Sequence, residues 1–223
     1  AAQIAGQTNS IVVVPVISSF EIPTQPGRYL GSAAMQQAVA DMMLGDRVAL
    51  ATSATAAGYE GVLPTKILLA GQRTGGGFAA EVAARTVDNG AATNLLGVVM
   101  FDGVASPNQF PASLAKLDSM GIPLYQIASP PQAGNNWGST TEQLVVLHPD
   151  HFVGVQLDYG SAMSAAITLA TGWINDIYEG LGPTNPNDGI YGNPNDGTYV
   201  ANQPLLIGET GGTVLPAPPP VDI

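Results

Sequence analysis

A glycine-rich turn around Arg73 is the part of the sequence best suited to chemistry. The apolar run 67–70 leads into Gly71, and a helix-like stretch over residues 77–87 follows Gly75. Glycines on both sides of the turn allow the backbone to lift the central side chain above a sheet, beside helix N-terminal amides that attract anions. The central residue is Arg73, whose guanidinium stays protonated and cannot act as a nucleophile. The turn therefore has the form of a reactive site without its nucleophile.

Two interpretations of Arg73 follow from this position. Its guanidinium could bind a carboxylate or a phosphate, since the helix amides already favour anions there. It could instead fill the turn and form an internal ion pair with Asp102 or another acid. A cation at a helix N-terminus is disfavoured by ~0.3–1 kcal/mol, which favours the internal pair as compensation. Thr74 is a further candidate nucleophile, but no histidine is expected near it.

Apolar runs and helix-like stretches alternate along the chain and predict the elements that position this turn. The runs expected to be buried parallel strands are residues 11–14, 67–70, 98–101, 124–127 and 152–157. The helix-like stretches are residues 33–44, 46–57, 77–87, 109–120 and 161–178. The runs lack polar alternation, as expected of strands covered on both faces. The order predicts an α/β fold with a doubly wound, mostly parallel sheet.

The chain changes character after residue 180, so we expect a core over 1–180 and a turn-rich, Pro-rich tail over 181–223. The segment Asn185–Tyr191 recurs as Asn193–Tyr199, each with an Asn-Asp-Gly turn signal. Two successive turns are the favoured interpretation. A calcium loop is the alternative, although the acidic spacing and terminal Glu of an EF-type loop are missing.

Composition excludes several classes of function. The chain has 17 acidic against 6 basic residues and a net charge of −11, so we expect no nucleic-acid partner. It has no cysteine, which excludes disulfides, thiolate metal sites and a cysteine nucleophile. We expect no cofactor, no metal site and no transmembrane segment. His148 and His151 are expected in a turn before the last run, with a metal pair including Asp150 as the alternative.

Several segments share a family likeness: the turn around Arg73 and residues 12–20, 31–43, 97–104 and 152–161. Together they resemble the dienelactone hydrolase and chlorophyllase-like actinobacterial branch of the α/β-hydrolases. The resemblance implies a sheet of α/β-hydrolase type and, in active relatives, carboxylic-ester hydrolysis by a Ser-His-Asp triad.

The resemblance places each triad role on this chain. Arg73 occupies the nucleophile position and Asp102 the acid position. The base position, after Gly160 and Ser161, holds Ala162. Only the acid is retained. The residues expected to bind a ligand beside them are Ser18, Ser19, Gln72 and Thr74.

The front of the domain departs from the family pattern. Run 11–14 corresponds to the fourth strand of the family, and the first three strands have no counterpart. A central strand without neighbours would leave its backbone groups unpaired. We therefore expect a homo-oligomer or a complementing N-terminal fragment to complete the sheet, or else a locally rebuilt edge.

Two functions from different classes follow. The first is a non-catalytic binding or assembly role on a retained hydrolase scaffold. The second is a carboxylic-ester hydrolase for lipid-like or polyester substrates whose catalytic positions are altered or mis-assigned in this sequence. The small residues at the start resemble the product of signal cleavage and favour an exported or cell-envelope protein; an additional upstream segment is the alternative.

Overall fold

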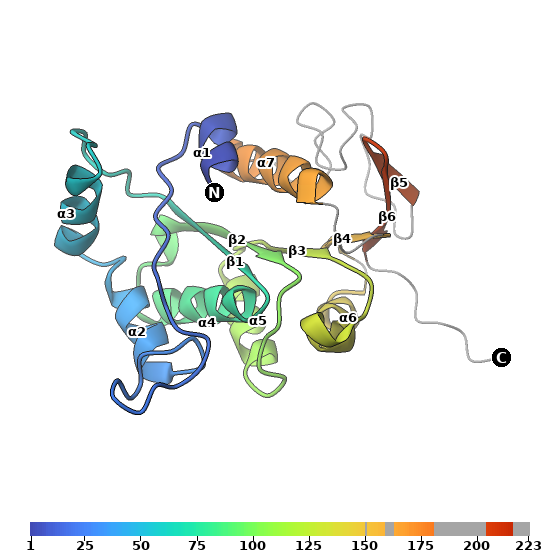
Figure 1. Cartoon of the computed structure of the whole chain (residues 1–223), viewed down its shortest axis with the longest axis horizontal. Coiled ribbons are helices and arrows are strands. Elements are labelled where there is room, and N and C mark those ends of the chain that lie inside the picture. Colours follow the sequence, from blue (N-terminus) through green and yellow to red (C-terminus); the bar gives the residue numbers. More distant parts are fainter. Residues whose placement is uncertain (150, 159–162, 181–203, 216–223) are drawn as a thin grey trace.

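A sheet flanked by helices organises the computed structural model, which describes residues 1–149, 151–158, 163–180 and 204–215 (Figure 1). In this part the sheet has six strands in the order β1-β2-β3-β4-β6-β5. They are β1 (Ile67–Gln72), β2 (Leu95–Phe101), β3 (Leu124–Ala128), β4 (Gly154–Leu157), β5 (Pro204–Ile207) and β6 (Thr210–Leu215). Strands β1 to β4 are parallel, whereas β6 runs antiparallel to β4 and β5. The predicted α/β fold with a mostly parallel sheet is confirmed.

Helices cover both faces of the sheet. Figure 1 shows α1 and α7 on one side and α2, α4, α5 and α6 on the other. Their bounds are α1 (Ala2–Thr8), α2 (Ala33–Asp41), α3 (Val48–Ala56), α4 (Thr74–Asp88), α5 (Phe110–Ser119), α6 (Ser139–Leu147) and α7 (Met163–Glu179). Two short 3-10 helices, η1 (Ala92–Asn94) and η2 (Ala133–Gly138), complete the described elements. None of the helices in this part of the chain is long and apolar enough to span a membrane.

Each face of the sheet has its own apolar core. Under α7, the rings of Tyr125, Phe152 and Trp173 meet edge to face, with centroids 5.2–5.7 Å apart. Burial, with a smaller contribution from Asp176, raises the pKa of Tyr125 to about 12. On the other face, Phe110 belongs to the core between the sheet and α4, α5 and α6. Burial of these apolar surfaces holds the strands that carry the candidate site.

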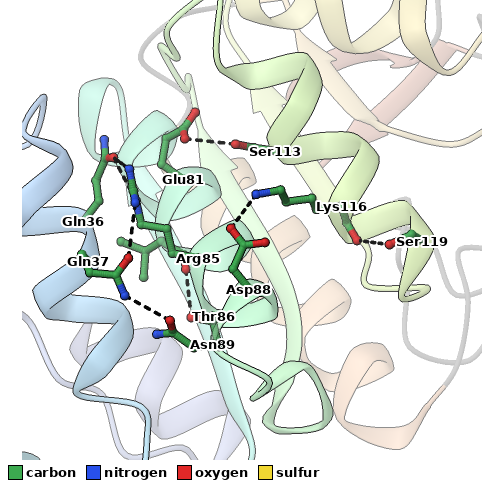
Figure 2. Close-up of polar contacts among 11 residues, drawn as sticks. Gln36, Gln37, Glu81, Arg85, Thr86, Asp88, Asn89, Ser113, Lys116 and Ser119 are labelled. Carbon is green, nitrogen blue, oxygen red and sulfur yellow. Dashed lines mark hydrogen bonds and ion pairs between the residues drawn. The ribbon is translucent and has the colours of Figure 1, made fainter.

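A layer of polar contacts fixes α4 between its neighbours α2 and α5 (Figure 2). Arg85 of α4 donates hydrogen bonds to Gln36 and Gln37 of α2 at 3.2–3.3 Å. Glu81, one turn earlier, accepts a hydrogen bond of 3.0 Å from Ser113 of α5. Burial raises the pKa of Glu81, although the bond from Ser113 and the charges of nearby cations oppose this shift. These contacts hold the middle and the C-terminal half of α4 between α2 and α5.

The predicted strand at residues 11–14 is wrong. This segment is neither helix nor strand, and its side chains are 39–67% exposed. Before it, Ile4 packs with the core under α7; after it, Ile17 packs with Phe78 and Val82 of α4. The segment therefore passes the edge of the sheet at β1, from one helical layer to the other (Figure 1). It is anchored on both faces and cannot lie along β1 as a neighbouring strand.

The hairpin of β5 and β6 was not predicted. It lies in the segment interpreted as a tail, and β6 joins the sheet beside β4. The Asn-Asp-Gly repeat and its calcium alternative fall in residues 181–203, outside the described residues. The boundary at residue 180 therefore stays a prediction.

Candidate functional site

The turn at Arg73 has the sharp geometry that the sequence predicts. Arg73 lies between β1 and α4 with φ 51° and ψ −124°, a strained conformation for a non-glycine residue. A Cβ atom on Gly71 would overlap the carbonyl oxygen of Gly75, so only glycine fits there. A Cβ on Gly77 would similarly overlap the carbonyl oxygen of Val104. The strain at Arg73 is thus held by close backbone contacts on both sides.

Backbone hydrogen bonds tie this turn to the end of the neighbouring strand β2. The N–H of Arg73 donates to the carbonyl of Phe101 at 2.9 Å. The carbonyl of Arg73 accepts from the N–H of Val104 at 2.8 Å. Asp102 lies between these two partners. Arg73 and Asp102 therefore stand at the adjacent carboxyl ends of two parallel strands, where ligands bind in open α/β sheets.

The carboxylate of Asp102 is fully engaged by the loop that follows β3. One oxygen accepts from the backbone N–H of Ser129 and from Asn135 Nδ2, each at 3.0 Å. The other oxygen accepts from the Ser129 hydroxyl at 2.6 Å. Asp102 itself has φ 54°, a left-handed conformation that Asp tolerates better than most residues. Its role in this structure is to organise the loop.

Buried polar side chains form further hydrogen bonds in and around this loop. Asn135 in η2 is buried and accepts from the N–H groups of Gln132 and Gly138 at 2.8 and 3.1 Å. Gln126 of β3 accepts from the N–H of Gly103 at 3.1 Å and donates to the Thr141 hydroxyl at 2.8 Å. The carboxyl ends of β2 and β3 are therefore linked to η2 and α6 through side-chain hydrogen bonds.

Arg73, in contrast, is exposed and has no acidic partner in the part of the chain that the structure describes. Among the described residues its guanidinium makes one hydrogen bond, a long one of 3.4 Å to the carbonyl of Gly134, and no ion pair. The predicted internal pair with Asp102 is wrong, because Ser129 and Asn135 already occupy that carboxylate. The N–H groups of Thr74 and Gly75 also make no hydrogen bond within this part of the chain. A cation and two free amides thus share the start of α4.

The other predicted site residues are only partly gathered at this turn. Gln72 ends β1 and Thr74 begins α4, and both are exposed. Ser18 pairs with the segment at Tyr29, and within the described residues neither Ser18 nor Ser19 forms a hydrogen bond with Arg73. Ala162, at the base position, lies outside the described residues.

The two histidines lie away from the turn, before β4. His148 Nε2 is 2.9 Å from a carboxylate oxygen of Asp118, and His151 is exposed. They sit at the N-terminal end of a parallel strand, opposite the end that carries Arg73. Within the described residues no group of three or more His, Cys, Asp or Glu side chains could hold a metal ion. Asp150, the third member of the metal alternative, is outside those residues.

Ser129, Gly134 and Asn135 belong to the site but were missed. Ser129 lies two residues after the run 124–127, so the rule that parallel strands end at one edge could have identified it. Gly134 and Asn135 lie in η2, and no periodic pattern in the sequence predicts this helix. Comparison of the chain with protein-family models, with curated proteins and with solved structures found no match.

Proposed function

We propose that this chain is a non-catalytic protein of α/β-hydrolase type that binds a small carboxylate ligand at the Arg73 turn. The observation that carries the proposal is the exposed guanidinium of Arg73, which has no ion pair among the described residues. It occupies the position that the family uses for its nucleophile. The same turn therefore offers an anion site in place of a reactive hydroxyl.

The local charges favour a single carboxylate. A cation at the start of α4 costs ~0.3–1 kcal/mol, and a bound anion would offset this cost. Arginine binds carboxylates through two parallel hydrogen bonds, and the N–H groups of Thr74 and Gly75 can add further donors. The nearby charge of Asp102 and the net charge of −11 disfavour ligands with several negative charges.

A titration with butyrate tests the proposal. Trp137 lies in η2 with Gly134 and is 70% exposed, whereas Trp173 is buried, so the fluorescence of Trp137 reports on this loop. We expect saturable binding that Arg73→Ala weakens at least about tenfold, since a hydrogen bond to a charged group contributes ~1.5–3 kcal/mol. Arg28→Ala, at another exposed arginine, is the matched control and should bind like the wild type. Equal binding by the Arg73 and Arg28 variants would refute the proposal.

A carboxylic-ester hydrolase remains the second candidate, because Asp102 and the glycines of the turn are retained. It requires that the residues at positions 73 and 162 be altered or mis-assigned in the sequence. Peptide sequencing by mass spectrometry across residues 66–85 and 152–170 decides this point. Arg73 and Ala162 in those peptides support the binding role; serine and histidine would support the hydrolase.

The binding role is compatible with assembly at the edge of the sheet. Within the described residues β1 has a neighbour on one side alone, β2. We propose that a second copy or a complementing N-terminal fragment covers this edge, because an exposed edge strand presents unpaired backbone groups. Neither a nucleic acid nor a cofactor has a part in this proposal, and export or attachment to the cell envelope stays a prediction.

A further inference from the structure

Residues 11–14 form an apolar surface of a kind that folded proteins seldom leave uncovered. The segment is Ile-Val-Val-Val, its side chains are 39–67% exposed, and Val16 beyond it is fully exposed. Within the described residues no backbone group of 11–17 makes a hydrogen bond. β-branched side chains with free backbone donors and acceptors are the properties of a strand that lacks a partner.

The segment is also held in place at both ends. Before it, Gln7 and Ser10 form side-chain hydrogen bonds of 3.2 Å with Thr171 and Tyr178 of α7. After it, Ile17 packs against α4. A partner strand therefore meets a segment whose ends are already fixed, which lowers the conformational entropy lost on binding.

Charge distinguishes this surface from the rest of the chain. Residues 1–20 contain no Asp, Glu, Lys or Arg, whereas the whole chain has a net charge of −11. Two copies that approach through other surfaces repel each other, while residues 11–14 can meet without facing like charges. This difference favours a second copy as the partner over a charged protein surface.

We infer that residues 11–14 of two copies pair as antiparallel strands about a two-fold axis, beside the open edge of β1. The same segment then serves both protomers, as the symmetry of a two-fold interface requires. Pro15 has no N–H, so it limits the ladder to the residues before it. This inference rests on the assembly part of the proposed function and names the partner.

Light scattering after size exclusion tests the inference on the full chain. We expect a dimer at about 100 µM that dissociates on dilution. The double variant Val12→Lys/Val14→Lys should be monomeric, because it introduces four positive charges into a paired region that has none in the wild type. Val62→Lys, at a side chain that is 92% exposed but outside the segment, is the control and should stay dimeric. At concentrations where the wild type is also monomeric, the melting temperatures of both variants should match that of the wild type, since the substituted side chains are exposed.

Hydrogen exchange of the amides provides the second measurement. In the dimer, alternate amides of residues 11–14, those that point to the partner strand, should be protected, and dilution should remove that protection. A wild type that is monomeric at about 100 µM would overturn both the inference and the proposed self-association. A dimer that persists in Val12→Lys/Val14→Lys would overturn the inference and leave assembly to another surface. Butyrate binding in the same variants tests the ligand proposal independently.

Discussion

Asp102 and Arg73 lie at the ends of neighbouring strands, but their side chains differ in hydrogen bonding and in exposure to solvent. The carboxylate of Asp102 accepts three hydrogen bonds from Ser129 and Asn135 and is built into the loop. Among the described residues the guanidinium of Arg73 makes one long hydrogen bond, to Gly134, and the residue is exposed. The end of β2 is therefore hydrogen-bonded to the loop after β3 through Asp102, whereas the side chain of Arg73 after β1 is exposed.

The shape of the turn and the chemical nature of its central side chain are separable. The strain at Arg73 is maintained by glycines and backbone hydrogen bonds that do not depend on the side chain at position 73. The turn can consequently carry an arginine without losing its shape.

The largest effect is expected from Gly71→Ala. The added methyl group would overlap the Gly75 carbonyl oxygen, so the turn must open, at a cost of about 2–3 kcal/mol. Gly75→Ala is the matched control: a Cβ there meets nothing within 4 Å, and alanine suits a helix. Urea denaturation measures both variants. Equal loss of stability in the two would show that the close contact at Gly71 does not hold the turn.

Asp102→Ala should have the next largest effect. It leaves the donors of Ser129 and Asn135 without their acceptor and places alanine at a positive φ, which together should cost about 1–3 kcal/mol. Asp102→Asn should cost less, because Asn tolerates this φ and its side-chain oxygen can still accept from the Ser129 N–H and from Asn135. Denaturation of the pair measures the difference. If Asn is as damaging as Ala, the loop depends on the charge of Asp102 and the account of its hydrogen bonds fails.

The smallest effect on stability is expected from Glu81→Gln, which tests a carboxyl group that contrasts with that of Asp102. Unlike Asp102, Glu81 accepts one hydrogen bond, and its other oxygen is buried without a partner among the described residues. Burial raises its pKa in the folded state above the ordinary value of 4.5, so the folded protein holds this proton more tightly than the unfolded chain. The wild type therefore gains stability from Glu81 at low pH and loses it as pH rises through the folded pKa.

Melting temperatures at several pH values measure this effect. The stability of Glu81→Gln relative to the wild type should rise between pH 4.5 and neutral pH, because the raised pKa of Glu81 makes the wild type lose stability over this range. A relative stability of Glu81→Gln that is constant with pH would contradict the raised pKa.

Much of the fold could be predicted from local patterns. The apolar runs at 67–70, 98–101, 124–127 and 152–157 all contribute to strands, and the turn at Arg73 starts a helix at Thr74 as expected. Strands β2, β3 and β4 are mostly buried, so their apolar composition reports their burial directly, whereas β1 is a half-buried edge strand. The hairpin of β5 and β6 was missed because it lies in a segment rich in glycine and proline. These residues indicate turns, and the short strands beside them were not recognised.

The errors arise where structure depends on partners far along the chain. Run 11–14 has the composition of a buried strand, but its flanks are anchored on opposite faces of the sheet. Asp102 was expected to pair with Arg73, but its carboxylate accepts hydrogen bonds from Ser129 and Asn135 instead. Neither the path of residues 11–14 nor the partners of Asp102 can be predicted from spacing in the sequence, because both depend on loops whose paths are set by tertiary packing.

Labelling with a fluorophosphonate, read by intact mass, tests the central claim most directly. This reagent modifies only activated nucleophiles, and the turn presents Arg73 in place of serine. The account predicts that the purified chain keeps its unmodified mass and hydrolyses p-nitrophenyl butyrate no faster than buffer. Stoichiometric labelling of Thr74 or of any serine, with hydrolysis above that of buffer, would contradict it.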